Sequence, residues 1–206
     1  MSLFKEKLNK QLASSLHENG FEEPKLIQQK TIARINGGAD IIGIGPDGVG
    51  KSTTIAITVI QKLREAFEDA PRAVILVGDV DKANALQEQF VRLSKHTDLR
   101  IRVAHEGGKI DKQGEEIYMG SDVVIGTPRR LFDLYLKQNL NLNKLKFFVL
   151  DDAELMIKHQ YQSQIERLLQ SLPKCQRLAF TNDFNPKVEA LVSRIMIHPT
   201  IVEVEE

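Results

Sequence analysis

The chain has 206 residues, with 28 basic and 28 acidic side chains and therefore no formal net charge. This balance argues against a histone-like polycation that binds nucleic acid through bulk electrostatics, although it leaves room for a local basic groove. The one cysteine, Cys175, cannot form an internal disulfide, and no apolar run approaches the roughly 20 residues that span a bilayer. Because the amino terminus also lacks the hydrophobic region of a signal peptide, we expect a cytoplasmic protein without a membrane partner.

Short apolar runs alternate with longer segments of helical period along the whole chain. This alternation predicts an α/β fold with an open, mostly parallel sheet of about seven strands and helices on both faces. The expected strands are Asp40–Ile44, Ala73–Val77, Ile101–His105, Asp122–Ile125, Phe147–Leu150, Arg177–Phe180 and Ile201–Val204. The expected helices are Phe4–Asn19, Lys25–Asn36, Lys51–Phe67, Lys82–Lys95, Pro128–Lys137, Gln160–Leu172 and Pro186–Arg194. Neither a linker nor a repeat divides the chain, which predicts a single domain over residues 1–206.

The first expected strand runs directly into residues 45–52, Gly-Pro-Asp-Gly-Val-Gly-Lys-Ser, a GxxxxGKS phosphate loop that opens a helix. Gly45, Gly48 and Gly50 allow backbone N–H groups to turn toward phosphate oxygens. We expect Lys51 to reach the terminal phosphates and the hydroxyl of Ser52 to bind Mg²⁺. The motif therefore predicts a phosphate-bearing ligand together with Mg²⁺.

A hydrophobic strand ends in three carboxylates at residues 151–154, Asp-Asp-Ala-Glu. A phosphate loop needs a second acidic site of this kind for the Mg²⁺ shell and the attacking water. We expect Asp151 to hold Mg²⁺ through water and Asp152 to orient or deprotonate the attacking water. Lys51, Asp151 and Asp152 are thus the candidate catalytic residues. An acidic first helical turn, favoured by the helix dipole, is the alternative explanation of the pattern.

Over essentially its whole length, the sequence resembles the amino-terminal RecA-like domain of the DEAD-box RNA helicases, which belong to superfamily 2. Residues 20–28 look like the family's Q motif, in which a glutamine, here Gln28, reads the adenine edge. Phe21 lies within this stretch, and Phe4 would match the family's upstream aromatic residue. The resemblance implies that the ligand of the phosphate loop is ATP and that ATP and Mg²⁺ are the cofactors.

Two further stretches resemble the elements that contact the RNA backbone in this family. One is the pair of glycines at 107–108, and the other is residues 126–131, which look like the TPGRL element. In the latter, a threonine N-cap and a proline at the first helical position leave backbone N–H groups free for a phosphate. A basic residue is also kept where the family has its PTRELA element. The RNA contacts implied by the resemblance are Lys82, Gly107, Gly108, Thr127, Arg129 and Arg130.

The chain departs from the family pattern at functional positions. Asp152 stands where the family has glutamate and Glu154 where it has aspartate, and the shorter Asp152 withdraws its carboxylate by about 1.5 Å. Asp47 occupies a position of the phosphate loop that is usually threonine. Thr181 and Asp183 flank an asparagine where the family has its SAT element, which couples the ATP site to strand separation. These departures leave hydrolysis and coupling open, with Thr181 and Asp183 as the candidate coupling residues.

The family's second RecA-like domain, which supplies arginines to the γ-phosphate and half of the RNA groove, has no counterpart in these residues. An arginine finger is worth about 10³–10⁵ in rate, so we expect very slow ATP hydrolysis and no RNA unwinding from this chain alone. The first hypothesis is an ATP- and RNA-binding amino-terminal domain of a DEAD-box-like RNA helicase, monomeric alone. It would remodel RNA only when joined to a second RecA-like domain in cis or in trans.

The alternative hypothesis is a catalytically degenerate helicase-like domain that binds RNA or a protein partner without turning over ATP. Whether the chain is an enzyme therefore stays open at this stage. A phosphate-loop NTPase unrelated to helicases is a third reading, but it leaves the Q-like, GG and TPxRL stretches unexplained.

Overall fold

The computed structural model describes residues 8–205, which form a seven-stranded sheet in the order β3-β4-β2-β5-β6-β1-β7. Every pair of neighbouring strands is parallel. The strands are β1 (Ile41–Ile44), β2 (Ala73–Leu76), β3 (Ile101–Ala104), β4 (Val123–Gly126), β5 (Phe147–Leu150), β6 (Gln176–Thr181) and β7 (Thr200–Glu203). The predicted α/β fold and parallel sheet are confirmed, with each strand within a residue or two of its expected position.

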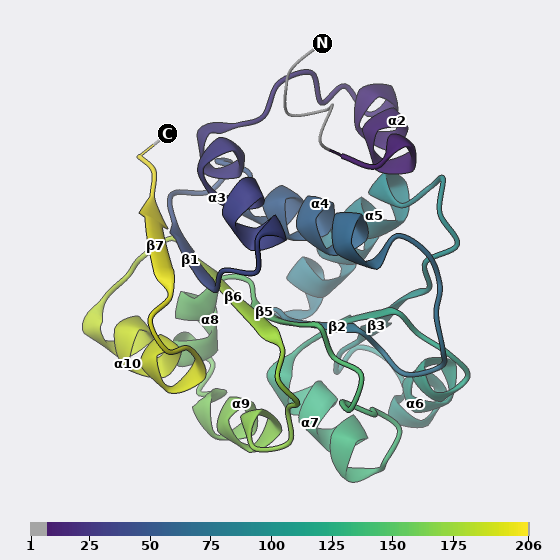
Figure 1. Cartoon of the computed structure of the whole chain (residues 1–206). Helices are drawn as coiled ribbons and strands as arrows, with labels where there is room; N and C mark the ends of the chain where they lie inside the picture. The colour runs from purple at the N-terminus through teal and green to yellow at the C-terminus, as the bar shows by residue number, and fades with distance from the viewer. Residues whose placement is uncertain (1–7, 206) are drawn as a thin grey trace.

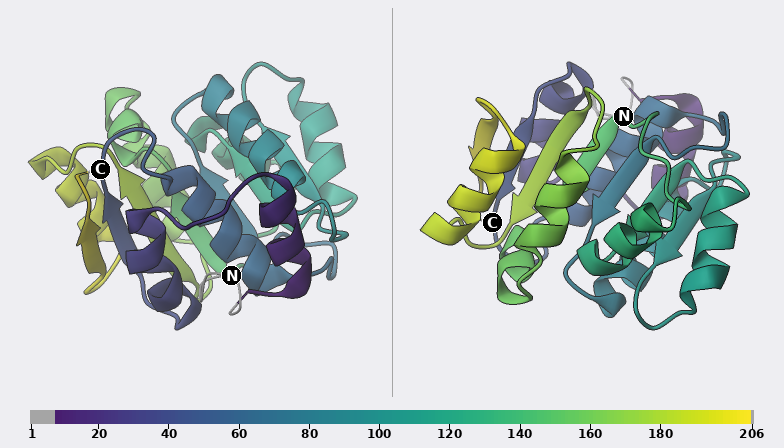
Figure 2. Two further views of the ribbon diagram at one scale, coloured as in Figure 1. Left: turned by 90° about the horizontal axis from the view of Figure 1, so that it is seen from above. Right: turned by 90° about the horizontal axis from the view of Figure 1, so that it is seen from below.

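Helices cover both faces of the sheet, as Figures 1 and 2 show. One face carries α2 (Lys10–Glu18), α3 (Leu26–Asn36), α4 (Lys51–Leu63) and α5 (Val80–Leu93). The other carries α6 (Ile110–Tyr118), α7 (Pro128–Leu136), α8 (Ala153–Lys158), α9 (Gln162–Leu169) and α10 (Pro186–Ile195). Because successive strand residues point to opposite faces, Ile41 belongs to the first apolar core and Ile42 to the second. Within residues 8–205, no helix is long and apolar enough to cross a membrane.

The sequence did not predict helices α6 and α8, and it predicted a longer α4 than the structure has. The α6 segment has a glycine, Gly114, in its middle, where an added β-carbon would lie 2.9 Å from the side chain of Asn139. The α8 segment has only six residues, too few for a helical period to show. The chain leaves α4 at Arg64, which has a φ of 64°, so this helix ends before Phe67. The helix expected over Phe4–Asn19 is observed as α2 from Lys10, because the side chain of Asn9 caps its first turn, while Phe4 lies outside the described residues. The helix expected over Gln160–Leu172 is also shorter, since α9 covers only Gln162–Leu169.

Parallel pairing gathers the ends of three strands at one edge of the sheet. β1 pairs with β6, and β6 pairs with β5, so their carboxyl ends lie side by side. The phosphate loop follows β1, Asp151 follows β5, and Asn182 follows β6. Ligands of open parallel sheets bind at this edge, outside the carboxyl ends of the strands. The fold therefore brings three stretches that are distant in sequence into one site.

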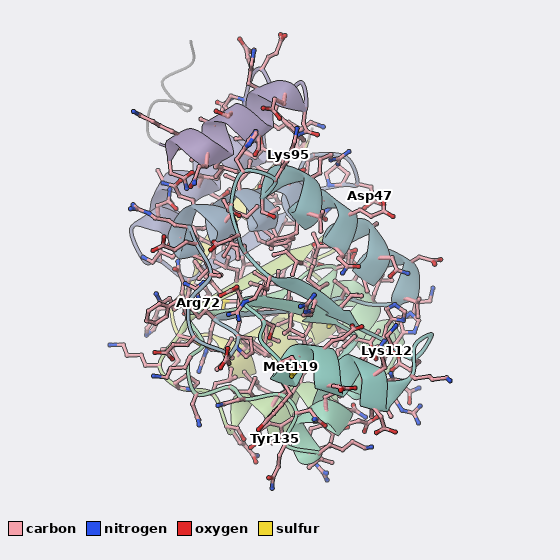
Figure 3. The ribbon with its side chains drawn as sticks, turned by 90° about the vertical axis from the view of Figure 1, so that its right-hand side faces the viewer. Asp47, Arg72, Lys95, Lys112, Met119 and Tyr135 are labelled. Carbon is pink, nitrogen blue, oxygen red and sulfur yellow. The ribbon has the colours of Figure 1, made fainter. Side chains whose placement is uncertain are left out.

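A buried charge cluster lies at the other end of the strands, where β2, β3 and β4 begin. Asp122 is fully buried and accepts hydrogen bonds from Arg72 Nη2 at 2.6 Å and Arg100 Nε at 2.9 Å. Burial alone would raise the pKa of Asp122, but the hydrogen bonds from Arg100 and Arg72 outweigh it and keep this pKa below its ordinary value. Figure 3 shows Arg72 and Asp47 on opposite sides of the molecule, so this cluster lies apart from the phosphate loop.

Candidate functional site

The phosphate loop is a tight turn that only glycine permits at two positions. Gly48 and Gly50 have φ values of 87° and 99°, in the region that disfavours a β-carbon. A β-carbon on Gly50 would also lie 2.9 Å from Nε2 of Gln28, so the loop packs directly against α3. Lys51 then begins α4, and the turn leaves the first N–H groups of that helix facing the loop. The local sequence thus builds a backbone turn that suits an anion.

The ammonium group of Lys51 is buried inside this loop, with the residue only 5% exposed. Nζ donates hydrogen bonds to the carbonyl oxygens of Gly45 at 2.7 Å and Pro46 at 2.9 Å. A third bond goes to Oδ1 of Asn182 at 2.5 Å, and a carboxylate oxygen of Asp47 lies 4.0 Å away. The lysine is therefore surrounded by oxygen atoms, which phosphate oxygens can replace.

Ser52 and Asp151 form a second pair beside the loop. Oγ of Ser52 donates to Oδ2 of Asp151 at 2.8 Å, while Oδ1 of Asp151 is buried without a hydrogen-bond partner among residues 8–205. Burial, followed by the neighbouring charge of Asp152, raises the pKa of Asp151 to about 7. A hydroxyl next to an orphaned carboxylate oxygen is a donor set that suits Mg²⁺. These residues fit a magnesium ion.

Asp152 adopts an unusual backbone conformation and forms an ion pair. It has a φ of 60° and a ψ of 60°, is 4% exposed, and stands at the N-terminus of α8. Its Oδ2 lies 2.8 Å from Nζ of Lys82. Burial opposes the charged form of Lys82, but the hydrogen bond and charge of Asp152 outweigh it and raise the pKa of Lys82. The sequence grouped Lys82 with the RNA contacts, whereas the structure places its ammonium beside the candidate catalytic carboxylates.

The candidate coupling residues join the same network unequally. Oγ1 of Thr181 lies 2.6 Å from Oε2 of Glu154 and 2.8 Å from the backbone carbonyl oxygen of Asp183. The carboxylate of Asp183 instead accepts a hydrogen bond from Nδ2 of Asn185 at 2.8 Å. Thr181 therefore contacts the acidic quartet through its hydroxyl, and Asp183 takes part through its main chain.

A pocket of about 480 Å³ lies over these groups. Its lining includes Phe21 and Gln28 from the Q-like stretch together with Lys51, Ser52 and Asp152. The buried amide of Gln28 accepts a hydrogen bond from the backbone N–H of Lys25 through Oε1, at 2.9 Å. The structure thus brings the Q-like stretch, the phosphate loop and the acidic quartet around one cavity. Gly48, Gly50 and Lys82 also line it.

The expected RNA elements form a separate cluster. Nη1 of Arg130 donates to the carbonyl oxygen of Gly108 at 2.9 Å, which joins the TPxRL stretch to the GG stretch. Thr127 is the N-cap residue of α7, as predicted, but its hydroxyl lies 2.9 and 2.8 Å from the two carboxylate oxygens of Glu106. Within residues 8–205, the side chain of Thr127 makes no capping hydrogen bond to the N–H groups of the first turn of α7. The backbone donors expected to meet a phosphate are therefore available.

The other two expected RNA contacts lie beside this cluster. The backbone N–H of Gly107 donates to Nδ1 of His105 at 3.1 Å. The pKa of Tyr161 is raised, chiefly by burial and then by the negative charge of Glu106. The positive charge of Arg129 partly offsets this increase. Gly107 and Arg129 are the sequence neighbours of Gly108 and Arg130, which contact each other.

Sequence reasoning missed two residues that the structure places at these sites. Asn182 binds the phosphate-loop lysine, and Glu106 binds Thr127. The signal for Asn182 was its position directly after a strand, since strand ends meet at the ligand edge. Glu106 directly precedes the two glycines, and no pattern indicates its partner.

Comparisons with known proteins agree with this geometry. A sequence model of the DEAD/DEAH box helicases matches residues 25–191. The ATP-dependent RNA helicase eIF4A of Eremothecium gossypii is 29% identical over 88% of this chain and 46% of its own. The protein of the same name from Kluyveromyces lactis is 27% identical over 97% of this chain and 50% of its own. The chain thus spans about half the length of these relatives.

Solved structures share the fold. A DEAD box protein from Methanococcus jannaschii superimposes with a TM-score of 0.89 at 24% identity, over 96% of this chain and 54% of that one. Dbp5 of Saccharomyces cerevisiae, in a complex with Gle1 and IP6, gives a TM-score of 0.89 at 24% identity, over 100% of this chain and 52% of that one. The predicted RecA-like architecture is thereby confirmed.

The buried carboxylate of Asp151 is expected to cost stability, and Asp151→Asn tests this. The raised folded pKa means that the native state binds a proton more tightly than the unfolded chain, so stability falls as pH rises from about 4 to 7. The variant should therefore be more stable than the wild type at pH 8, by up to about 4 kcal/mol, and equal to it near pH 4. Urea denaturation at both pH values measures the difference.

Asp69→Asn is the control, because Asp69 is 84% exposed and lies 3.5 Å from Arg100. This change should alter stability by less than about 1 kcal/mol. Loss of stability in Asp151→Asn at pH 8 would show that the carboxylate is not a destabilising group.

Proposed function

Since the chain belongs to the DEAD/DEAH box helicase family, we propose that it is the ATP- and RNA-binding amino-terminal domain of an ATP-dependent RNA helicase. The observation that carries the proposal is the Ser52–Asp151 pair beside the Lys51 ammonium, with one carboxylate oxygen that has no partner in the described part of the chain. Remodelling of RNA would require a second RecA-like domain, in cis or in trans. The relatives named above are ATP-dependent RNA helicases about twice the length of this chain.

In this proposal the ATP lies along the pocket, with its base near Phe21 and Gln28 and its phosphates in the loop. Gly45, Gly48 and Gly50 shape the loop, and Lys51 binds the terminal phosphates. Mg²⁺ would be held by Ser52 and, through water, by Asp151. The ion would supply positive charge to the phosphates as negative charge builds on them during transfer.

The RNA backbone would meet the cluster around Arg130. The free N–H groups at the start of α7 and the adjacent guanidinium groups of Arg129 and Arg130 suit a phosphate. Gly107 and Gly108 lie at this cluster, and Thr127 sits at the α7 N-terminus. Thr181 is the last residue of β6, and its hydroxyl contacts Glu154 of the acidic quartet. This contact supports a role for Thr181 in coupling.

A cytoplasmic location, a monomeric state and a single domain over residues 1–206 stay predictions. Phe4, expected near the adenine, also stays a prediction.

Lys51→Ala is expected to abolish measurable ATP binding, because it removes the buried ammonium that faces the phosphates. The measurement is isothermal titration calorimetry with ATP and Mg²⁺. Lys62→Ala is the matched control, since Lys62 lies exposed on the same helix, at its far end, and should bind as the wild type does. Unchanged binding by Lys51→Ala would contradict the proposal.

Glu106→Gln is expected to strengthen RNA binding, because it removes a negative charge beside the expected phosphate position and keeps an acceptor for Thr127. The gain should be about threefold to tenfold at low salt and should shrink as salt is raised, since screening weakens exposed charges. Fluorescence anisotropy with a labelled single-stranded RNA measures it. Glu65→Gln, at an exposed position near the amino ends of the strands, should have no effect. Weaker RNA binding by Glu106→Gln would place the RNA elsewhere.

The second candidate function is binding without ATP turnover. It is favoured by the Lys82–Asp152 ion pair, which occupies the carboxylate expected to orient the attacking water. The two candidates differ in ATP hydrolysis by the chain joined to a second RecA-like domain, measured with and without RNA. The proposal predicts RNA-stimulated hydrolysis, whereas the absence of turnover under both conditions would favour the second candidate.

A further inference from the structure

The ammonium group of Lys51 already donates as many hydrogen bonds as it can. A protonated lysine has three N–H donors and no acceptor. Three oxygen atoms lie within hydrogen-bond distance of Nζ, those of Gly45, Pro46 and Asn182. The ammonium group has no spare donor, so a phosphate oxygen must displace one of the three acceptors.

Asn182 is the acceptor that moves most easily. The Gly45 and Pro46 oxygens belong to the main chain of the loop itself, whereas the Asn182 oxygen is at the end of an exposed side chain in the connection after β6. Displacing a side chain requires a rotamer change, while displacing a main-chain carbonyl requires the loop to deform. A terminal phosphate therefore competes chiefly with Asn182.

Asp47 holds the Asn182 amide in the competing orientation. Nδ2 of Asn182 donates to Oδ1 of Asp47 at 2.9 Å, so the amide oxygen is turned toward Lys51. The carboxylate of Asp47 is itself 76% exposed and lies 4.0 Å from the ammonium. The hydrogen bond from Asn182 also holds the pKa of Asp47 below its ordinary value. Asp47 is thus a positioning residue that acts through Asn182.

We infer that Asn182 sets the affinity of the site for nucleotide by competing with the terminal phosphate for the ammonium group of Lys51. The inference rests on the proposed function, because it requires a nucleotide in the phosphate loop.

Two substitutions at Asn182 should move ATP affinity in opposite directions. Asn182→Ala removes the competitor and should tighten Mg²⁺–ATP binding by about threefold to tenfold, the value of one ordinary intramolecular hydrogen bond. Asn182→Asp replaces the competitor by a carboxylate, which pairs more strongly with Lys51 and repels the phosphates, so it should weaken binding. Calorimetric titration with ATP and Mg²⁺ measures both. Asn143→Ala, at an exposed asparagine before β5, is the control and should bind as the wild type does.

The competing explanation is that Asn182 only supports the pocket, and adenosine monophosphate separates the two. This ligand lacks the terminal phosphates that Lys51 would bind, so both variants should bind it as the wild type does. Equal shifts for the monophosphate and for ATP would overturn the inference. So would unchanged or weaker ATP binding by Asn182→Ala while the wild type binds, a result that leaves the proposed function intact. If neither the wild type nor Asn182→Ala binds ATP, the proposed function and the inference both fail.

Discussion

The buried ammonium group of Lys51 is the point on which the rest of the site depends. A charged group removed from water must be paired or hydrogen-bonded, or it destabilises the fold. Here the acceptors come from two separate elements, the phosphate loop after β1 and Asn182 after β6. Both elements reach the ammonium because β1 and β6 are parallel neighbours whose carboxyl ends lie together. The topology of the sheet therefore determines the chemistry at its edge.

The unusual residues of this site occur in contact with one another or with compensating partners. Asp47, which stands where the family usually has threonine, accepts a hydrogen bond from Asn182. Asn182 itself lies after β6 in the stretch that replaces the family's SAT element. Asp152, the shortened acid of the quartet, pairs with Lys82. Glu154, the lengthened one, reaches the hydroxyl of Thr181. Each of these three carboxylates thus has a hydrogen-bond donor or a cationic partner within the site.

The sequence predicted what depends on local pattern, and the structure supplied what depends on topology. The strands were found because buried runs such as Phe147–Leu150 are apolar throughout, and the phosphate loop because its glycines and lysine are contiguous. The contact of Lys51 with Asn182 joins residues 131 positions apart, and no local pattern encodes it. The short helix α8 could not be predicted from local pattern either, because its six residues are too few to show a helical period.

The most direct test of a magnesium-nucleotide site at this edge is the effect of Mg²⁺ on ATP affinity. The wild-type chain would be titrated calorimetrically with ATP, once with excess Mg²⁺ and once with EDTA. If Ser52 and the orphaned oxygen of Asp151 hold the ion, Mg²⁺ should tighten ATP binding by at least about tenfold, since the ion also relieves the repulsion between the phosphates and the nearby carboxylates. Equal affinity in the two titrations would contradict a metal site at Ser52 and Asp151.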